Sequence, residues 1–169
     1  MAGFVANGMP FTFEEVCICS TGVIGVPLPM EKIENGIDDC IDALSDHGSP
    51  YAAKAIMTTD TVRKERAIEI EIGAKTVRLG AIAKGSGMIS PNMATMICIV
   101  TTDATISADL LNELLKASVN VSFNQIGIDN DMSTSDTVIV FANAQSPAPE
   151  IQKDTPDCET FAHALTALC

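Results

Sequence analysis

Apolar residues recur at helical spacing in three segments of the chain. From Met30 to Leu44, an isoleucine or leucine returns every three or four positions, which places these side chains on one face of a helix. Ser107 is a favourable N-cap and precedes a leucine-rich run, so a second helix is predicted to begin there. Cys158 to Cys169 predicts a third, amphipathic helix. The apolar positions of the first two helices are Ile33, Ile37, Ile41 and Leu44, and Leu110, Leu111, Leu114 and Leu115.

Other segments carry the apolar pattern of strands. Ala67 to Gly73 alternates apolar and charged residues, and Lys75 to Leu79 continues after a Gly-Ala turn, which predicts a β-hairpin with Glu69 and Glu71 facing solvent. Ala52 to Met57 is compatible with a short helix or a strand. This mixture predicts an α/β fold of layered sheets and helices. Further strands are predicted at Glu15–Cys19, Met96–Val100, Phe123–Asp129 and Thr137–Ala142.

Length and charge narrow the class of protein. With 169 residues, one domain spanning residues 1–169 is expected. The chain has 22 acidic and 10 scattered basic residues, a net charge of -12, which argues against nucleic-acid binding. No apolar run approaches the about 20 residues that cross a bilayer, and the first residues lack the features of a signal peptide. We therefore expect a soluble, cytoplasmic protein with no membrane or nucleic-acid partner.

The potential metal ligands lack the spacing of a metal site. Of the six cysteines, three lie in apolar strand-like runs, which favours reduced core cysteines over a disulfide framework. Cys17 and Cys19 are one residue apart and far from either histidine, unlike zinc ligands. Asp129, Asp131 and Asp136 resemble a calcium loop, but the glycine and the closing glutamate of an EF-hand are missing. The sequence therefore does not predict a metal site.

A glycine-rich turn that leads into an apolar run is the most informative motif. It reads Lys84-Gly-Ser-Gly-Met-Ile-Ser-Pro-Asn-Met-Ala-Thr-Met96. Its glycines and proline suit a turn that delivers the hydroxyl of Thr95 to the start of a strand. A threonine needs a base to act as a nucleophile, and cleavage of the bond between Ala94 and Thr95 would supply one, because the freed α-amino group could deprotonate its own hydroxyl. The alternative is that Thr95 only enters or caps a strand.

Two further motifs carry groups suited to acyl-transfer chemistry. Ser20-Thr21-Gly22 lies at a predicted strand end, where the Thr21 hydroxyl and the Gly22 N–H could stabilise a tetrahedral oxyanion. The alternative is an ordinary Ser-Thr-Gly turn. Lys84 could hold a substrate carboxylate as a point charge, or it could be a solvated surface lysine.

Together these motifs resemble the glutamate N-acetyltransferase family, the bifunctional ornithine acetyltransferases of arginine biosynthesis. The matching segments follow the family order over nearly the whole chain, and their combination is far more specific than any one of them. They are Cys19–Gly25 with Pro29 and Met30, Ala55–Thr61, Lys84–Met96, Thr101–Ala104, Phe123–Asp129 and Ser133–Thr137.

The resemblance implies a mechanism and a set of site residues. The precursor would cleave itself between Ala94 and Thr95, and acetyl would pass from N2-acetyl-L-ornithine to L-glutamate through an acetyl-Thr95 intermediate. Thr21 and Gly22 fall on the oxyanion positions. The substrate-binding positions fall on Lys84, Thr95 and Thr61, with Thr59 as the reserve within the Thr58–Thr61 cluster.

The resemblance also implies the architecture and the partners. It implies an N-terminal-nucleophile-like fold, an α2β2 assembly of cleaved chains, and acyl transfer without a metal or organic cofactor, although some members also use acetyl-CoA as a substrate. A full member is more than twice this length, so we expect a partial catalytic domain truncated at both ends, with 1–94 in the α chain and 95–169 beginning the β chain. An N-terminal-nucleophile amidohydrolase or aminopeptidase and a non-catalytic binding domain remain as alternatives.

Overall fold

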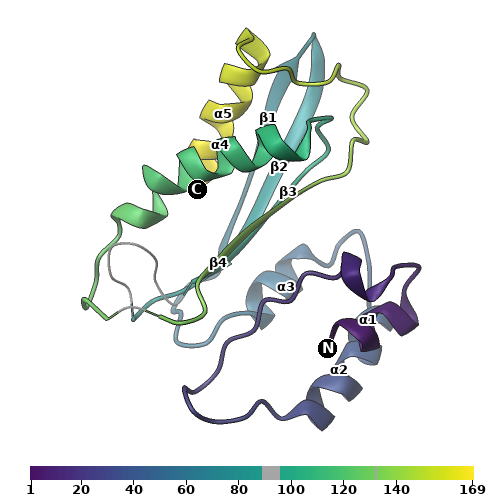
Figure 1. Ribbon diagram of the computed structural model, residues 1–169, viewed down its shortest axis with the longest axis vertical. Coiled ribbons are helices and arrows are strands. Elements are labelled where there is room, and N and C mark those ends of the chain that lie inside the picture. The colour runs from purple at the N-terminus through teal and green to yellow at the C-terminus, as the bar shows by residue number, and fades with distance from the viewer. Residues whose placement is uncertain (89–95, 132) are drawn as a thin grey trace. The chain divides into compact units, whose positions relative to one another are not determined.

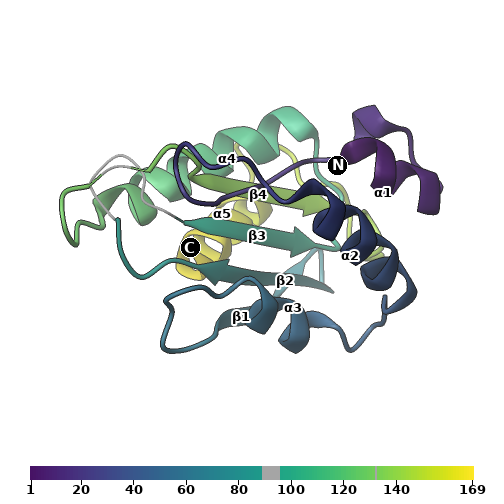
Figure 2. The ribbon, with the colours of Figure 1, turned by 90° about the horizontal axis from the view of Figure 1, so that it is seen from below.

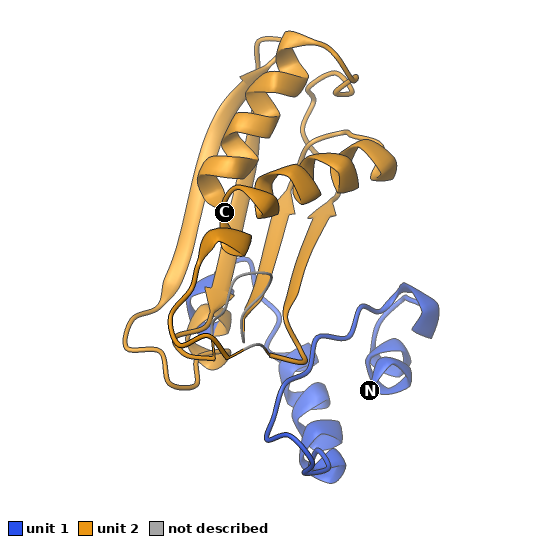
Figure 3. Cartoon of the chain, turned by 60° about the vertical axis from the view of Figure 1, so that its left-hand side comes forward, with its two compact units in different colours: residues 1–51 blue, residues 52–169 orange. Residues whose placement is uncertain are grey.

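The chain forms two compact units. A computed structural model describes residues 1–88, 96–131 and 133–169, and its units are Met1–Tyr51 and Ala52–Cys169 (Figure 3). Helix α3 (Ser49–Ala55) contains the boundary, so the helical alternative for this segment is confirmed. The expectation of a single partial catalytic domain stays a prediction, and its expected division between residues 94 and 95 lies outside the described residues.

A mixed β-sheet forms the framework of the second unit (Figure 1). Strand β1 (Lys64–Ile72) pairs antiparallel with β2 (Lys75–Lys84), β2 pairs antiparallel with β3 (Ile97–Thr102), and β3 pairs parallel with β4 (Thr137–Ala142). The described strands lie side by side in chain order, β1-β2-β3-β4 (Figure 2). The α/β class is therefore confirmed, as are the predicted hairpin and the strands beginning near residues 96 and 137.

A two-residue turn sets the register of the hairpin. Gly73 and Ala74 both have positive φ, 54° and 59°, the conformation that matches the twist of two antiparallel strands. Gly73 is also required sterically, because a Cβ atom there would lie 2.5 Å from Pro149 Cγ. With Ile72 opposite Lys75, the alternation leaves Glu69 and Glu71 exposed, as predicted.

The hydrophobic core lies between one face of this sheet and two helices, α4 (Ala108–Asn120) and α5 (Pro156–Leu168) (Figure 1). Alternation along the strands places every second side chain on this face. Burying each large apolar side chain contributes about 1.5–3 kcal/mol relative to leaving it exposed. The fully buried members include Ile72, Val77, Leu79, Cys98, Val100, Ile151, Phe161 and Leu165.

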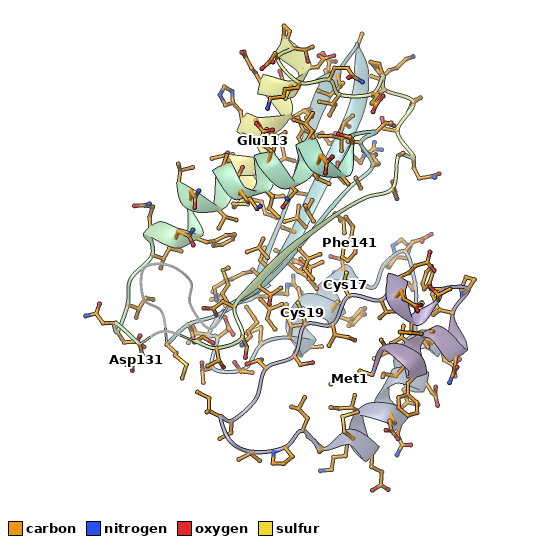
Figure 4. The ribbon with its side chains drawn as sticks, in the orientation of Figure 1. Met1, Cys17, Cys19, Glu113, Asp131 and Phe141 are labelled. Carbon is orange, nitrogen blue, oxygen red and sulfur yellow. The ribbon has the colours of Figure 1, made fainter. Side chains whose placement is uncertain are left out.

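Both core helices begin where the sequence supplies a cap. Ser107 Oγ accepts a hydrogen bond from the Leu110 N–H at 3.3 Å, as predicted. Thr155 caps α5 in the same way through the Cys158 N–H at 3.2 Å, and Pro156 occupies the first helical position, where its missing N–H is not needed. On the surface, Glu113 of α4 pairs with Lys153 at 2.7 Å (Figure 4).

The first unit contains α1 (Ala2–Gly8), the short 3-10 helix η1 (Phe13–Glu15) and α2 (Met30–Asp42). The predicted helix from Met30 is thus confirmed. Its apolar stripe packs against α1 at Gly8, where a Cβ atom would lie 2.6 Å from Ile41 Cδ1.

Two predicted strands are wrong. The segment predicted as a strand at Glu15–Cys19 holds the end of η1 and then irregular chain, because Thr12 and Glu15 form a capping box that starts a helical turn. The segment predicted at Phe123–Asp129 begins with a 3-10 helix, η2 (Phe123–Gln125), and continues without regular structure. Here local hydrogen bonds, such as Ser122 Oγ to the Ser118 carbonyl at 2.6 Å, outweigh the apolar pattern.

Candidate active site

Lys84 occupies the last position of β2 and is buried, with only 3% of its surface exposed. It pairs with Ile97 of β3, which in turn pairs with Thr137 of β4. These three residues therefore lie opposite one another on neighbouring strands at this end of the sheet. Alternation along β2 places Lys84 on the face opposite the core helices. Within the described residues its ammonium group makes no hydrogen bond or ion pair. The alternative that Lys84 is a solvated surface lysine is therefore wrong.

Asp60 fixes the start of the glycine-rich turn. Its carboxylate is 1% exposed and accepts hydrogen bonds from the Lys64 ammonium, from the Gly85 N–H at 2.8 Å and from the Thr58 N–H at 3.3 Å. Gly85 has a φ of 147°, which favours glycine at this position. Burial raises the pKa of Asp60, but its bonds to Lys64, Gly85 and Thr58 outweigh burial and lower the pKa to about 2. Asp60 is therefore a charged anchor for this turn at neutral pH.

We expect Asp60→Asn to destabilise the protein in a pH-dependent way. Lowering the pKa from 3.8 to about 2 corresponds to about 2 kcal/mol of folding stability. Because the folded-state pKa is the lower one, this contribution is present above pH 4 and is lost as the pH falls toward 2. Urea unfolding should show the variant about 2 kcal/mol less stable at pH 7, with the difference shrinking below pH 4.

The exposed Glu71 provides the control for this experiment. Glu71→Gln removes a carboxylate from β1 without touching the glycine-rich turn, and its free energy of unfolding should equal that of the wild type. Equal stability of Asp60→Asn and wild type at pH 7, or a difference that does not change with pH, would show that Asp60 is not a charged anchor.

Two more carboxylates hold the main chain on either side of residues 89–95. Asp129 Oδ2 accepts from the Met88 N–H at 2.6 Å, and Asp136 Oδ1 accepts from the Met96 N–H at 2.8 Å. Thr137 completes the second anchor by donating its N–H to the Met96 carbonyl at 2.9 Å. The backbone of the predicted motif is thus held by carboxylates at Gly85, Met88 and Met96, all from residues distant in sequence.

One carboxylate oxygen of Asp136 has no hydrogen-bond partner among the described residues. Its Oδ2 atom is buried and makes no hydrogen bond within the described part of the chain. Burial raises the pKa of Asp136 above its ordinary value, while hydrogen bonding by the Met96 N–H and by the Ser133 side chain, and the charge of Lys84, oppose this effect. An acidic and a basic side chain therefore lie at the same end of the sheet, close enough for the charge of Lys84 to act on Asp136.

A small cavity of about 90 Å³ opens between the ends of β1, β2 and β3. Its walls are largely apolar, and the charged side chains among them are both lysines. Because Lys64 is paired with Asp60 and alternation turns the Lys84 side chain to the other face of β2, this cavity is an apolar recess beside the core. The lining residues are Lys64, Ala83, Lys84, Gly85, Met96, Phe123 and Ile126.

The other predicted site residues have different outcomes. Thr95 and Ala94, predicted as nucleophile and cleavage site, lie outside the described residues. Thr61 is exposed and makes no hydrogen bond among the described residues, whereas the reserve, Thr59, bonds through its hydroxyl to Ser86 Oγ in the glycine-rich turn at 2.6 Å. Among the residues that the structure describes, Thr59 therefore makes a side-chain hydrogen bond to the turn, and Thr61 does not.

The predicted oxyanion pair belongs to the first unit. Thr21 is partly buried and Gly22 is exposed, and Leu28 Cδ2 lies 3.2 Å from where a Gly22 Cβ would stand. A side chain at position 22 would therefore crowd Leu28. The oxyanion role of the pair stays a prediction.

The cysteines are free, as predicted, although only Cys98 and Cys158 are buried. Burial raises the pKa of Cys98 to about 12 and that of Cys169 to about 11. These two thiols are therefore protonated at neutral pH and are poor nucleophiles. The described residues contain no group of three or more His, Cys, Asp or Glu side chains placed to hold a metal ion.

Comparison with known proteins assigns the chain to a family. The model of the ArgJ family matches residues 1–169. The chain belongs to the ArgJ family. A relative from Symbiobacterium thermophilum is 48% identical over 168 residues, and one from Synechococcus sp. is 47% identical over 165 residues. Both are named arginine biosynthesis bifunctional protein ArgJ.

The match covers nearly all of this chain but less than half of each ArgJ relative. The alignments include 99% and 98% of the chain and 42% and 40% of the two relatives, respectively. Among solved structures, the PH0078 protein from Pyrococcus horikoshii aligns with 62% of this chain at 18% identity and covers 35% of its own chain, with a TM-score of 0.40. This likeness is too low to define the fold. No helix in the described ranges is long and apolar enough to span a membrane.

The sequence did not identify the three anchoring carboxylates as a group. Asp60 lies 25 residues from Gly85, and Asp129 and Asp136 lie 41 and 40 residues from their partners Met88 and Met96. No local pattern links residues so far apart. The only signal was that each aspartate lies in or beside a segment that resembles a family motif.

Proposed function

We propose that this ArgJ-family chain is part of a glutamate N-acetyltransferase that transfers acetyl from N2-acetyl-L-ornithine to L-glutamate in arginine biosynthesis. The observation that carries the proposal is the family match over residues 1–169, which includes the glycine-rich motif and its threonine. The names of the relatives place them in arginine biosynthesis. Because the chain spans about 40% of those relatives, the activity is proposed for the full-length gene product.

The proposed reaction begins with cleavage of the peptide bond between Ala94 and Thr95. The new α-amino group of Thr95 then accepts the proton of its own hydroxyl while Thr95 Oγ attacks the acetyl carbonyl of acetylornithine. As the tetrahedral intermediate collapses, the α-ammonium of Thr95 returns this proton to the departing amine nitrogen, the amide bond breaks, and ornithine leaves while acetyl stays bound to Thr95. The amino group of glutamate attacks this ester and regenerates the free hydroxyl. The two half-reactions form a ping-pong scheme without a metal or organic cofactor.

In this scheme Lys84 binds both substrates. Acetylornithine and glutamate each carry an α-carboxylate, and Lys84 presents a buried ammonium group that lacks a partner among the described residues. An ion pair that excludes water is stronger than one at the surface. This arrangement supports one carboxylate-binding position that donor and acceptor occupy in turn, as a ping-pong reaction needs.

A second activity, acetylation of glutamate from acetyl-CoA, is proposed because the relatives are named bifunctional. It would use the same acetyl-Thr95 intermediate with a thioester as donor. We also propose an N-terminal-nucleophile-like fold for the complete enzyme and an α2β2 assembly of its cleaved chains. The α/β sheet with its helices is compatible with that fold class.

Acetyl acceptors distinguish the transferase from an amidohydrolase. Ornithine release from acetylornithine should depend on glutamate and should yield acetylglutamate in equal amount. Release at the same rate without glutamate, with acetate as the product, would instead support an N-terminal-nucleophile hydrolase. Absence of both cleavage and acetylation would support a non-catalytic binding domain.

Thr21→Val should lower kcat if Thr21 donates to the oxyanion. Removal of one such donor costs about 3 kcal/mol, so we expect a loss of roughly a hundredfold in kcat with little change in KM. Steady-state acetyl transfer by the full-length gene product measures both constants. Ser20→Ala is the control and should retain wild-type kcat, because among the described residues the Ser20 hydroxyl hydrogen-bonds only to Met1 Sδ, at 3.6 Å. Wild-type kcat in Thr21→Val would exclude the oxyanion role.

A further inference from the structure

Two neighbouring residues ahead of β1 are bonded to the glycine-rich turn that follows β2. The Asp60 carboxylate accepts the Gly85 N–H at 2.8 Å, and the Thr59 hydroxyl lies 2.6 Å from Ser86 Oγ. These two links join residues that are 25 and 27 positions apart in the chain. Because the links are adjacent, they fix both the position and the direction of the turn as it leaves the strand.

The link to Gly85 acts directly beside Lys84. The Gly85 N–H belongs to the peptide group that joins Lys84 to Gly85, and this group is planar, so the hydrogen bond fixes its orientation. On β3, Ile97 is the partner of Lys84 in the strand ladder. The main chain of Lys84 is therefore held by the sheet and by Asp60, and together they set the direction in which its side chain begins.

The position of the Lys84 ammonium group depends on this main-chain support. Lys84 is buried, and among the described residues its ammonium group makes no hydrogen bond or ion pair. No such bond within the described ranges fixes the far end of the side chain. A small rotation of the peptide group beside Lys84 would therefore move its ammonium group, because the displacement grows along the side chain.

The bonds of Asp60 require a carboxylate. One oxygen accepts from the Lys64 ammonium and the Gly85 N–H, and the other accepts from the Thr58 N–H. A carboxylate accepts through both oxygens, whereas an asparagine has one acceptor oxygen and an amide group that only donates. Asparagine at position 60 would therefore turn a donor toward another donor, and at least one of these bonds would be lost.

We propose that Asp60 and Thr59 are positioning residues for substrate binding, which hold Lys84 where its ammonium group meets the substrate α-carboxylate. This inference rests on the proposed function, in which Lys84 binds the carboxylate of acetylornithine and of glutamate. In this role Asp60 and Thr59 act through the turn and do not contact the substrate. Their loss displaces the Lys84 ammonium group without removing its charge, so the binding of donor and acceptor is weakened alike.

Asp60→Asn in the full-length gene product tests the proposal. We expect the KM for acetylornithine and the KM for glutamate each to rise about tenfold, while kcat changes less than about twofold. The assay is run at a temperature at which circular dichroism shows the variant to be folded. A lowered kcat with wild-type KM values would overturn the positioning role.

A double-mutant cycle separates positioning from stability. Asp60→Asn should lower kcat/KM about tenfold in the wild type but less than about twofold in Lys84→Met, because the ammonium group that Asp60 positions is then already absent. N-acetylputrescine, which is acetylornithine without its α-carboxylate, should be turned over with the same kcat/KM by the wild type and by Asp60→Asn. Additive losses in the cycle, or a tenfold loss with N-acetylputrescine as well, would overturn the proposal.

Asp103 provides the matched control because it also accepts a main-chain N–H of β2. Its Oδ1 atom accepts from the Arg78 N–H at 2.7 Å, away from the Lys84 end of the strand. Asp103→Ala removes this bond and should lower the free energy of unfolding while both KM values stay as in the wild type. KM values raised as much as in Asp60→Asn would show that any weakening of β2 impairs binding, which would overturn the specific role of Asp60.

Ser86→Ala tests the second link. Ser86 is exposed, so the loss of its hydroxyl should leave the protein folded. We expect both KM values to rise about threefold with wild-type kcat, because Thr59 then loses its bond to the turn. Wild-type KM values in Ser86→Ala would overturn the role of Thr59, and they would overturn the whole proposal if Asp60→Asn does not fold.

The wild-type protein and Lys84→Met separate this inference from the proposed function. Acetyl transfer by the wild type that is lost in Lys84→Met, together with additive losses in the cycle, would overturn the roles of Asp60 and Thr59 alone. A full-length wild type without acetyl transfer would overturn these roles and the proposed function together.

Discussion

Thr95→Ala is expected to leave the full-length gene product as one uncut chain without acetyltransferase activity. The substitution removes the hydroxyl that attacks the peptide bond during maturation and the acetyl group during turnover. Because one atom serves both reactions, both should be lost together, and acetyl transfer should fall by roughly 10⁵-fold or more. A denaturing gel measures cleavage, and acetylglutamate formation measures transfer.

Two variants make the Thr95→Ala result specific. Thr95→Ser retains a hydroxyl at the same position and should retain cleavage and measurable transfer at a reduced rate. Thr101→Ala removes a threonine hydroxyl that is exposed on β3 and should behave like the wild type. Rapid acetylornithine turnover by Thr95→Ala would refute the assignment of Thr95 as the nucleophile.

Lys84→Met is expected to abolish substrate recognition while preserving the fold. Removing one member of a buried charge pair costs about 2–5 kcal/mol, so kcat/KM for acetylornithine should fall by about a thousandfold. The methionine keeps much of the volume of the lysine stem. It also removes a buried charge that has no hydrogen-bonding partner in the described structure, so the free energy of unfolding should not decrease.

Stability and activity together distinguish the roles of Lys84. If Lys84 were structural, its substitution would lower the free energy of unfolding. If Lys84 binds substrate, its substitution lowers kcat/KM and leaves the free energy of unfolding unchanged. Lys75→Met, at the exposed start of β2, changes the same charge away from the site and should alter neither quantity. Wild-type kcat/KM in Lys84→Met would contradict the carboxylate-binding role.

Local patterns predicted most of the regular structure. The isoleucine stripe of α2, the Gly-Ala turn of the hairpin and the serine cap of α4 each rest on interactions within a few residues, and all three were predicted from the sequence. The strand predicted at Phe123–Asp129 failed because an apolar run does not distinguish a strand from a helical turn when local side chains bond the backbone.

The site was predictable only where one residue carried its own signal. Lys84 was a candidate because of its place beside the glycine-rich turn, but its burial depends on the sheet. Asp60, Asp129 and Asp136 each anchor a main-chain N–H that is 25 to 41 residues away, and such pairing appears only when the chain is folded. The sequence therefore pointed to the motif, and the structure identified the carboxylates that hold it.

Intact-mass spectrometry of the full-length gene product shows whether cleavage frees Thr95 and whether Thr95 then carries acetyl. We expect two chains whose junction is the Ala94–Thr95 bond. After brief incubation with acetylornithine and no glutamate, the chain that begins at Thr95 should be heavier by one acetyl group, and glutamate should remove it. A single uncut chain, or cut chains that never gain the acetyl group, would contradict the role of Thr95 as the nucleophile.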